Sequence, residues 1–208
     1  MAKQKIMLGN EAIARGAYEA GVKVSAAYPG TPSTEISENL VQYDDIYCEW
    51  SPNEKVATEV AIGASISGVR AMASMKHVGL NVASDPLYTA SYIGANGGLM
   101  VVVADDPGLY SSQNEQDTRM VARAAQIPVI EPSDSAEAKD FFKAAFELSE
   151  KFDRPFIFRT TTRLAHSQGL VELCERENIE DKEYIKNIQK NVMMPGNAKL
   201  RHVEIEKR

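Results

Sequence analysis

Residues 98–104 read Gly-Leu-Met-Val-Val-Val-Ala, a run without a polar side chain. Such a run is typical of a strand in a parallel sheet that helices cover on both faces. Further strands are predicted at residues 22–28, 46–50, 69–75, 128–130 and 155–159. Helices are predicted between them at residues 10–20, 53–68, 86–93, 115–125 and 135–151. Because strands that alternate with helices form βαβ units, we expect an α/β fold with an open, mainly parallel six-stranded sheet and helices on both faces.

The composition is that of a soluble globular protein. Of the 208 residues, 44% are hydrophobic and 25% are charged, and the formal net charge is -6. An acidic balance argues against a nucleic-acid or anionic-membrane surface, since both require a basic field. No apolar run reaches the length of a membrane span, and the polar start Met-Ala-Lys-Gln-Lys is not typical of a secretory signal. We therefore expect a cytoplasmic protein with neither nucleic-acid nor membrane partners.

Several familiar sites are excluded by the residues that the chain lacks. Two cysteines, Cys48 and Cys174, cannot form a disulfide framework or a four-thiolate metal or iron–sulfur site. The three histidines, His77, His166 and His202, show no metal-ligand spacing, so no metal site is expected on this chain. The phosphate loop GxxxxGK(S/T), the dinucleotide motif GxGxxG after the first strand and the hydrolase elbow GxSxG are also absent.

The last part of the chain has a different pattern. We expect a domain over residues 1–172 and a charged helical tail over residues 173–208 that links this domain to a missing one. Within the tail, a poorly amphipathic helix is predicted over residues 175–191, followed by a break at Pro195. Such a tail fits a chain that is naturally short or cut from a longer one, and a self-contained arm is the alternative.

One stretch, Ser51-Pro52-Asn53-Glu54, follows a predicted strand and begins a predicted helix. One interpretation is local: Ser51 caps the helix, Pro52 takes its first position and Glu54 completes a capping box. The other is functional, because ligands of open α/β sheets bind beyond the carboxyl ends of the strands. A carboxylate at that place can meet a ligand, and the two interpretations do not exclude each other.

The sequence also resembles a known family. Glu54 is followed by the pattern Glu-x6-Ala-Ile-Gly-Ala-Ser, which resembles the pyrimidine-binding domain of thiamine-diphosphate enzymes. Seven ordered blocks over about residues 6–172 are similar to the large (alpha) subunits of indolepyruvate ferredoxin oxidoreductases, and the MMPGNA of the tail is similar as well. The blocks are AYPGTPSTEI, EWSPNEKVA, EVAIGAS, MKHVGLNVASDPL, VVVADDPG, SSQNEQDTR and EPSDSAEAKD.

The resemblance implies the thiamine-diphosphate-binding fold and a reaction. That reaction is the oxidative decarboxylation of an aryl pyruvate, a 2-oxoacid, to an acyl-coenzyme A, with electrons passed to ferredoxin. Glu54 would contact N1′ of the aminopyrimidine and favour the imino form that removes a proton from the thiazolium. Glu59 is its nearest rival, but it falls on a different face of the helix.

The same resemblance implies the other site residues. Thr31, with Tyr28 and Pro29, would line the substrate pocket, although Thr31 also fits as a helix cap. Cofactor contacts are implied for Lys76, Gly79 and Asn81, at a position where other 2-oxoacid enzymes carry a small Ser/Gly-Pro-Gly type of loop. A catalytic role is implied for His77, and the alternative is an exposed histidine without a role. Arg119 could clamp a substrate carboxylate, or it could be a solvated helix residue.

The family holds the diphosphate and its Mg²⁺ through a GDG signature on a second domain, and no GDG occurs here. We therefore expect half of a cofactor site, inactive by itself. The implied partners are a diphosphate-binding domain or chain that supplies the Mg²⁺ site, a small (beta) subunit, iron–sulfur clusters on partner domains, ferredoxin and coenzyme A. The isolated chain is also expected to form homo-oligomers through its exposed cofactor face. Two alternatives stay open: a subunit of a non-oxidative thiamine-diphosphate 2-oxoacid decarboxylase, and a non-catalytic assembly partner.

Overall fold

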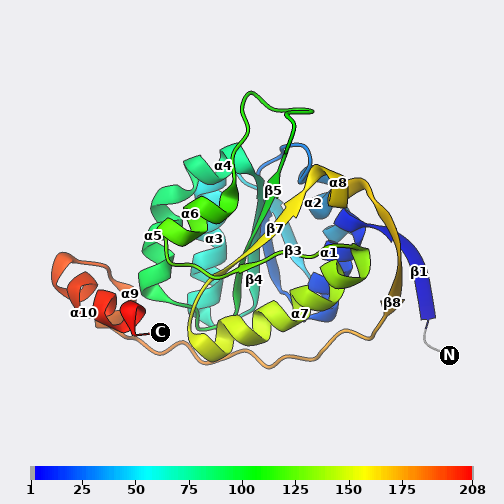
Figure 1. Cartoon of the computed structure of the whole chain (residues 1–208). Helices are drawn as coiled ribbons and strands as arrows, with labels where there is room; N and C mark the ends of the chain where they lie inside the picture. Colours follow the sequence, from blue (N-terminus) through cyan, green and yellow to red (C-terminus); the bar gives the residue numbers. More distant parts are fainter. Residues whose placement is uncertain (1–2, 208) are drawn as a thin grey trace.

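A computed structural model, which describes residues 3–207, has a six-stranded sheet at its centre in the order β3-β2-β4-β5-β7-β6 (Figure 1). All five strand pairings are parallel. The strands are β2 (Val24–Ala27), β3 (Tyr47–Trp50), β4 (Ala71–Lys76), β5 (Leu99–Asp105), β6 (Val129–Ile130) and β7 (Phe156–Thr161). Each lies at a predicted strand, so the expected α/β sheet is confirmed.

Helices cover both faces of this sheet, which explains the apolar run in β5. Met100 and Val102 face one layer, formed by α1 (Gly9–Glu19), α2 (Thr34–Leu40) and α7 (Ser135–Phe152). Val101 and Val103 face the other layer. That layer consists of α3 (Glu54–Ser67), α4 (His77–Val82), α5 (Ser84–Ile93) and α6 (Thr118–Ala124). A strand buried from both sides has no position for a polar side chain until its end.

A second, two-stranded sheet was not predicted. Strands β1 (Lys3–Leu8) and β8 (Gln168–Leu173) pair antiparallel, with Ile6 opposite Leu170. Most of their residues are exposed, so neither strand carries the apolar run that identifies a buried strand. The short helix α8 (Thr162–His166) joins β7 to β8 and was also missed.

The helix predicted over residues 175–191 is wrong. Residues 174–187, which we call the strap, contain no helix and run beneath the ends at which the strands begin (Figure 1). The strap is fixed by main-chain bonds from Glu177 N to Glu19 O (2.9 Å) and from Lys182 N to Gly68 O (3.0 Å). These bonds outweigh the helix preference of the strap residues, because local propensity is weak compared with tertiary contacts.

Two helices follow the strap, so the helical character of the tail is confirmed at other residues than expected. They are α9 (Ile188–Asn191) and α10 (Pro195–Glu206), and both contact α5. Pro195 was expected to break a helix but begins one, since the first helical position needs no N–H donor. The division of the chain into a domain and a tail at residue 172 stays a prediction.

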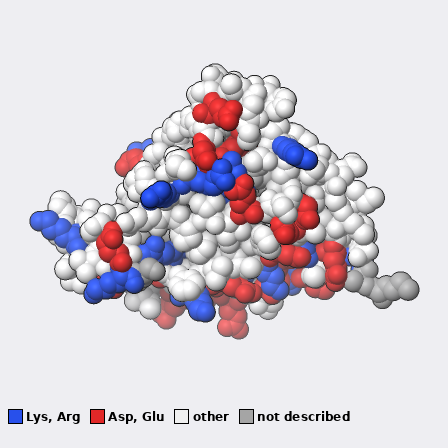
Figure 2. Space-filling view, viewed as in Figure 1, with Lys and Arg blue, Asp and Glu red and all other residues white. Residues whose placement is uncertain are grey.

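On the face seen in Figure 2, charged side chains gather along the lower edge, over the C-terminal helices and at the centre of the face. The upper rim is mostly uncharged apart from an acidic group near its top. That rim includes the loop that projects above the sheet in Figure 1. Among residues 3–207, no helix combines the length and the apolar character that a membrane span requires.

Candidate functional site

The loops that carry the candidate residues meet at the carboxyl edge, by which we mean the edge where the parallel strands end. They include residues 28–33 after β2, residues 51–53 after β3, the start of α4 after β4, and the β5–α6 loop (residues 106–117). The strap occupies the opposite edge. Open α/β sheets bind their ligands at the carboxyl edge, so this is where a site is expected.

Glu54 is the first residue of α3 and is half-buried. The predicted capping box is wrong: Asn53 is the N-cap and accepts a hydrogen bond from Val56 N (3.0 Å). Ser51 instead donates to Glu49 (3.0 Å). No residue in the described part of the chain hydrogen-bonds to the Glu54 carboxylate. Because it has no capping role and lies at the positive end of a helix dipole, this carboxylate is available to a ligand.

Gly79 brings α4 directly against Glu54. A Cβ atom at position 79 would lie 2.4 Å from Glu54 Oε1 and 2.8 Å from Glu54 Cδ, which is closer than atoms can approach. Any side chain at position 79 would therefore force the Glu54 carboxylate to move. The start of α4 and the start of α3 are packed as one unit through this pair.

Lys76, the last residue of β4, is only 8% exposed and joins two loops. Its aliphatic chain packs on Gly30, where a Cβ would lie 3.1 Å from Lys76 Cβ. Its ammonium group donates a hydrogen bond to Ser111 O in the β5–α6 loop. The substrate loop expected after β2 and the β5–α6 loop are thus both in contact with one lysine.

His77 follows Lys76 and is 1% exposed. Its Nε2 bonds to Asn114 O (3.1 Å). A carbonyl oxygen only accepts, so Nε2 must carry a proton. The other ring nitrogen, Nδ1, is buried and has no partner among the residues that the structure describes. A buried nitrogen without a partner is unusual and points to a missing ligand or water.

Asp106 also holds the β5–α6 loop in place. Its carboxylate accepts hydrogen bonds from Ser111 N (2.7 Å), Ser112 Oγ (2.6 Å) and Thr162 Oγ1 (2.7 Å). Burial alone would raise the pKa of Asp106, but these hydrogen bonds and the charge of Lys76 lower it to about 2. Farther along this loop, Glu115 accepts a hydrogen bond from Gly108 N (3.0 Å).

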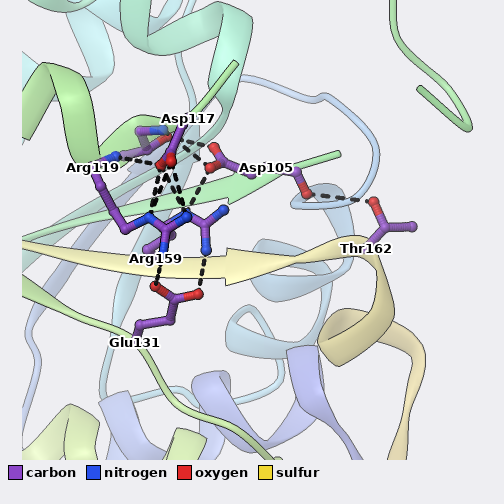
Figure 3. A network of polar contacts seen from close by, with 7 residues as sticks. Asp105, Asp117, Arg119, Glu131, Arg159 and Thr162 are labelled. Atoms are coloured by element: carbon purple, nitrogen blue, oxygen red, sulfur yellow. Dashed lines mark hydrogen bonds and ion pairs between the residues drawn. The ribbon is translucent and has the colours of Figure 1, made fainter. Parts of the chain in front are cut away.

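Arg119 lies in the network of Figure 3, on the first turn of α6. Its Nε and Nη2 each bond to an oxygen of Asp117 (2.9 Å), and its Nη1 is 3.8 Å from Glu131. These carboxylates hold Arg119 toward the base of the β5–α6 loop. The structure does not bring it into contact with Glu54 or Lys76 among the described residues.

The remaining predicted residues are exposed at the carboxyl edge. Tyr28, Pro29 and Thr31 lie in the loop after β2, and Asn81 lies on α4. Thr31 does not cap α2, since that helix begins at Thr34 and its N-cap is Ser33. The loop is closed instead by Thr34 Oγ1, which accepts from Gly30 N (2.9 Å).

Four of the predicted residues, Glu54, Lys76, His77 and Gly79, therefore come together around the start of α4. The contacts through Gly30, Ser111 and Asn114 were not foreseen, because main-chain partners and close approaches leave little signal in a sequence. The adjacent pair Asp105-Asp106 after an apolar strand was the one available signal for the loop support.

Within residues 3–207, no group of three or more His, Cys, Asp or Glu side chains is arranged to hold a metal ion. Both cysteines are free thiols. Cys174 is exposed, and Cys48 is partly buried, which raises the pKa of its thiol.

A carboxylate, a lysine and a histidine gathered at the carboxyl edge of a parallel sheet define an α/β ligand-binding domain. A family model described as "Pyruvate flavodoxin/ferredoxin oxidoreductase, thiamine diP-bdg" matches residues 15–204. The chain belongs to this thiamine-diphosphate-binding family, which confirms the resemblance drawn from its motifs.

Curated proteins with similar sequences have names that agree with this family. The chain is 53% identical to indolepyruvate oxidoreductase subunit IorA of Archaeoglobus fulgidus over 97% of this chain and 34% of that protein. It is 56% identical to the subunit of the same name from Pyrococcus horikoshii, over 89% of this chain and 30% of that protein. A more distant relative, 2-oxoglutarate synthase subunit KorA of Methanothermobacter thermautotrophicus, is 28% identical. The chain thus spans about a third of the length of the most similar relatives.

The fold recurs in a solved structure. A 2-oxoglutarate:ferredoxin oxidoreductase from Magnetococcus marinus, with 2-oxoglutarate, coenzyme A and succinyl-CoA bound, superposes with a TM-score of 0.78. The match covers 99% of this chain and 44% of that one at 18% sequence identity. At that identity the likeness concerns the fold, and it confirms the expected architecture.

Proposed function

We propose that this chain is the pyrimidine-binding half of a thiamine-diphosphate-dependent 2-oxoacid:ferredoxin oxidoreductase of the indolepyruvate type. The reaction would be the oxidative decarboxylation of indolepyruvate or another aryl pyruvate to its acyl-coenzyme A. The observation that carries the proposal is the half-buried Glu54 carboxylate, packed on Gly79 and without a partner in the described chain. The names of the relatives support the type of substrate.

The residues at the start of α3 and α4 fit an aminopyrimidine. Glu54 would hold the ring and exchange a proton with its nitrogen N1′. When bound, thiamine diphosphate supplies the nucleophilic carbon and the electron sink for decarboxylation. The absence of a side chain at Gly79 leaves α4 close enough to fix the direction of the Glu54 carboxylate. Since Asn53 caps α3, Glu54 is not needed as a cap, which disfavours a purely structural role for it.

Lys76 and His77 complete the cofactor side of the proposed site. The unpartnered Nδ1 of His77 can accept one hydrogen bond or proton, which suits a proton transfer near the reacting carbon. Lys76 supplies a positive charge: its aliphatic chain packs on Gly30 in the loop that follows β2, and its ammonium group donates to Ser111 O. Asn81 is exposed on α4, where a cofactor or a docked domain can reach it.

The 2-oxoacid is assigned to the loop after β2. Thr31 offers a hydroxyl, and Tyr28 and Pro29 form an exposed apolar wall. Arg119 is the candidate for the substrate carboxylate, and it would have to leave Asp117 to reach it. A charge-assisted, bidentate contact with a carboxylate is strong enough to compete with an exposed ion pair.

The proposal requires partners. A second domain or chain would hold the diphosphate and Mg²⁺, because the GDG signature for that role is missing from this sequence. Iron–sulfur clusters, the small (beta) subunit, ferredoxin and coenzyme A would belong to the assembled enzyme. We place that enzyme in the cytoplasm and propose that this chain self-associates through its carboxyl edge.

The test is Glu54→Gln in the enzyme reconstituted with its partners. Loss of the acidic proton should lower thiamine-diphosphate-dependent turnover about 100-fold or more. The matched control is Glu59→Gln, which makes the same change at an exposed position of the same helix and should retain turnover. Circular dichroism checks that both variants fold. Equal turnover in Glu54→Gln and wild type would contradict the catalytic assignment.

A further inference from the structure

The β5–α6 loop (residues 106–117) is largely exposed, but buried charged groups hold it in place. Most of its residues are exposed, and Tyr110 near its tip is 82% exposed. The groups that hold it are buried and titratable: Asp105, Asp106, Lys76 and His77. Burying charged groups is costly unless they are paired and hydrogen-bonded. Four such groups hold the otherwise exposed β5–α6 loop in one position.

The two ends of the loop are fixed together by Asp105 (Figure 3). Its carboxylate accepts hydrogen bonds from Thr118 N (3.1 Å) and from Thr118 Oγ1, at the start of α6. Arg159 Nε also donates to it (2.7 Å). Since Asp105 ends β5 and Thr118 begins α6, these bonds close the base of the loop.

The first turn of the loop is fixed by Asp106. One carboxylate oxygen, Oδ2, accepts from both Ser111 N and Ser112 Oγ, and the other, Oδ1, accepts from Thr162 on α8. These bonds hold Ser111 through its N–H and Ser112 through its hydroxyl, and the Ser111 carbonyl belongs to the peptide unit between these two residues. That carbonyl is the acceptor for the Lys76 ammonium.

The chain of contacts therefore runs from Asp106 through Ser111 to Lys76, and the charge of Lys76 also acts on Asp106. Lys76 in turn packs on Gly30. A displacement of this turn would release the ammonium group beside the proposed cofactor site.

We propose that Asp106 is a positioning residue: it fixes the turn whose Ser111 carbonyl holds the Lys76 ammonium in place for the proposed thiamine-diphosphate site. The inference rests on the proposed function. Asp106 itself touches neither cofactor nor substrate, and its effect passes through Lys76.

The first test measures Lys76 in this chain. Asp106→Ala removes all three acceptor contacts, so acylation of the Lys76 amine, followed by peptide mass spectrometry, should become about fivefold faster or more. Hydrogen exchange at residues 111–114 should rise about tenfold or more, as for a locally opened segment. Asp106→Asn keeps one acceptor oxygen and should restore part of the protection.

Two further variants keep the test decisive. Ser112→Ala removes a single bond to Asp106 and should give a smaller change of the same kind. It provides the test if Asp106→Ala does not fold. Asp45→Asn removes an exposed carboxylate far along the chain and should behave as wild type.

The second test uses the reconstituted enzyme. Asp106→Ala should raise the half-saturating concentration of thiamine diphosphate about tenfold or more and change the KM for the 2-oxoacid less than about threefold. Asp106→Asn should lie between this variant and wild type. A structural role alone would lower the active fraction without such a split.

Unchanged Lys76 acylation in folded Asp106→Ala, or equal changes in both constants, would overturn the inference. If wild type itself shows no thiamine-diphosphate-dependent turnover, the proposed function fails, whatever Asp106 does to Lys76. The two failures are thus distinguishable.

Discussion

At the scale of single residues, the contact between Glu54 and Gly79 limits where the proposed catalytic carboxylate can lie. A carboxylate at the start of a helix gains from the helix dipole, but its direction is usually free. Here α4 lies so near that a side chain at position 79 would displace the Glu54 carboxylate, so glycine at this position leaves room for it. The spacing of Glu54 in the sequence identified the acid. The need for glycine opposite it follows only from the approach of two helices that are 25 residues apart in the chain (79 minus 54).

Gly79→Ala is therefore expected to displace Glu54, because the new methyl group would overlap its carboxylate. Turnover of the reconstituted enzyme should fall about tenfold or more, since a small misplacement of a catalytic group is costly. Gly63→Ala in α3 is the control: no atom lies within 4 Å of its new methyl group. That change should raise the free energy of unfolding by about 1 kcal/mol, as Ala does over Gly in a helix, and leave turnover intact. Turnover and urea unfolding of both variants settle the comparison.

At the scale of elements, the apolar pattern of the sequence predicted the strands of the large sheet but not the elements that depend on other contacts. All six strands of the large sheet were found, because each coincides with a short, mainly apolar run. Strands β2, β4, β5 and β7 are largely buried, whereas β3 and β6 at the two sides of the sheet are only partly buried. The exposed strands β1 and β8 carry no such run and were missed. Around Ser51, the sequence offered several residues able to begin a helix, and the structure uses Asn53. The helix predicted for the strap residues is wrong for another reason. The strap is held by main-chain bonds to residues far away in the sequence, and a local sequence pattern carries no signal for such bonds.

Arg176 is the side chain that binds the strap most directly to the domain. It donates to Tyr18 O (2.8 Å) and Val22 O (2.9 Å), and its guanidinium lies over the Tyr18 ring. Arg176→Met should lower the free energy of unfolding by about 2 kcal/mol, because two charged hydrogen bonds are lost. It should also speed proteolytic cleavage within residues 174–187. Lys186→Met, at an exposed position of the same segment, is the control. Identical cleavage of the two variants would show that Arg176 does not hold the strap.

At the scale of the whole molecule, the two edges of the sheet differ. The strap covers the edge where the strands begin and itself exposes Tyr184 and Ile185. The carboxyl edge exposes several large apolar side chains. These are Tyr28, Trp50, Val82, Leu109 and Tyr110. A cluster of exposed apolar groups on one edge is typical of a surface that meets another protein. This arrangement agrees with the half-site proposed above, in which a second domain completes the cofactor cleft.

By itself, the chain is expected to self-associate through this edge at high concentration. Sedimentation velocity should show dimers or larger species, and Trp50→Ser combined with Tyr110→Ser should shift them toward monomer because the apolar area is reduced. Tyr184→Ser combined with Leu200→Ser removes two exposed apolar side chains from the tail and serves as the control. Strictly monomeric wild type at every concentration would contradict the prediction.

The strap also constrains the residues of the domain against which it lies. In addition to the side-chain contacts of Arg176, its main-chain bonds require a close approach to the backbone of the domain. This requirement falls on two glycines with positive φ, Gly21 and Gly68, where a Cβ would lie 3.0 Å from Glu177 O and 1.8 Å from Lys182 O. The pair of glycines just before β2 and β4 is the place to recognise whether another member of the family carries such a covering segment.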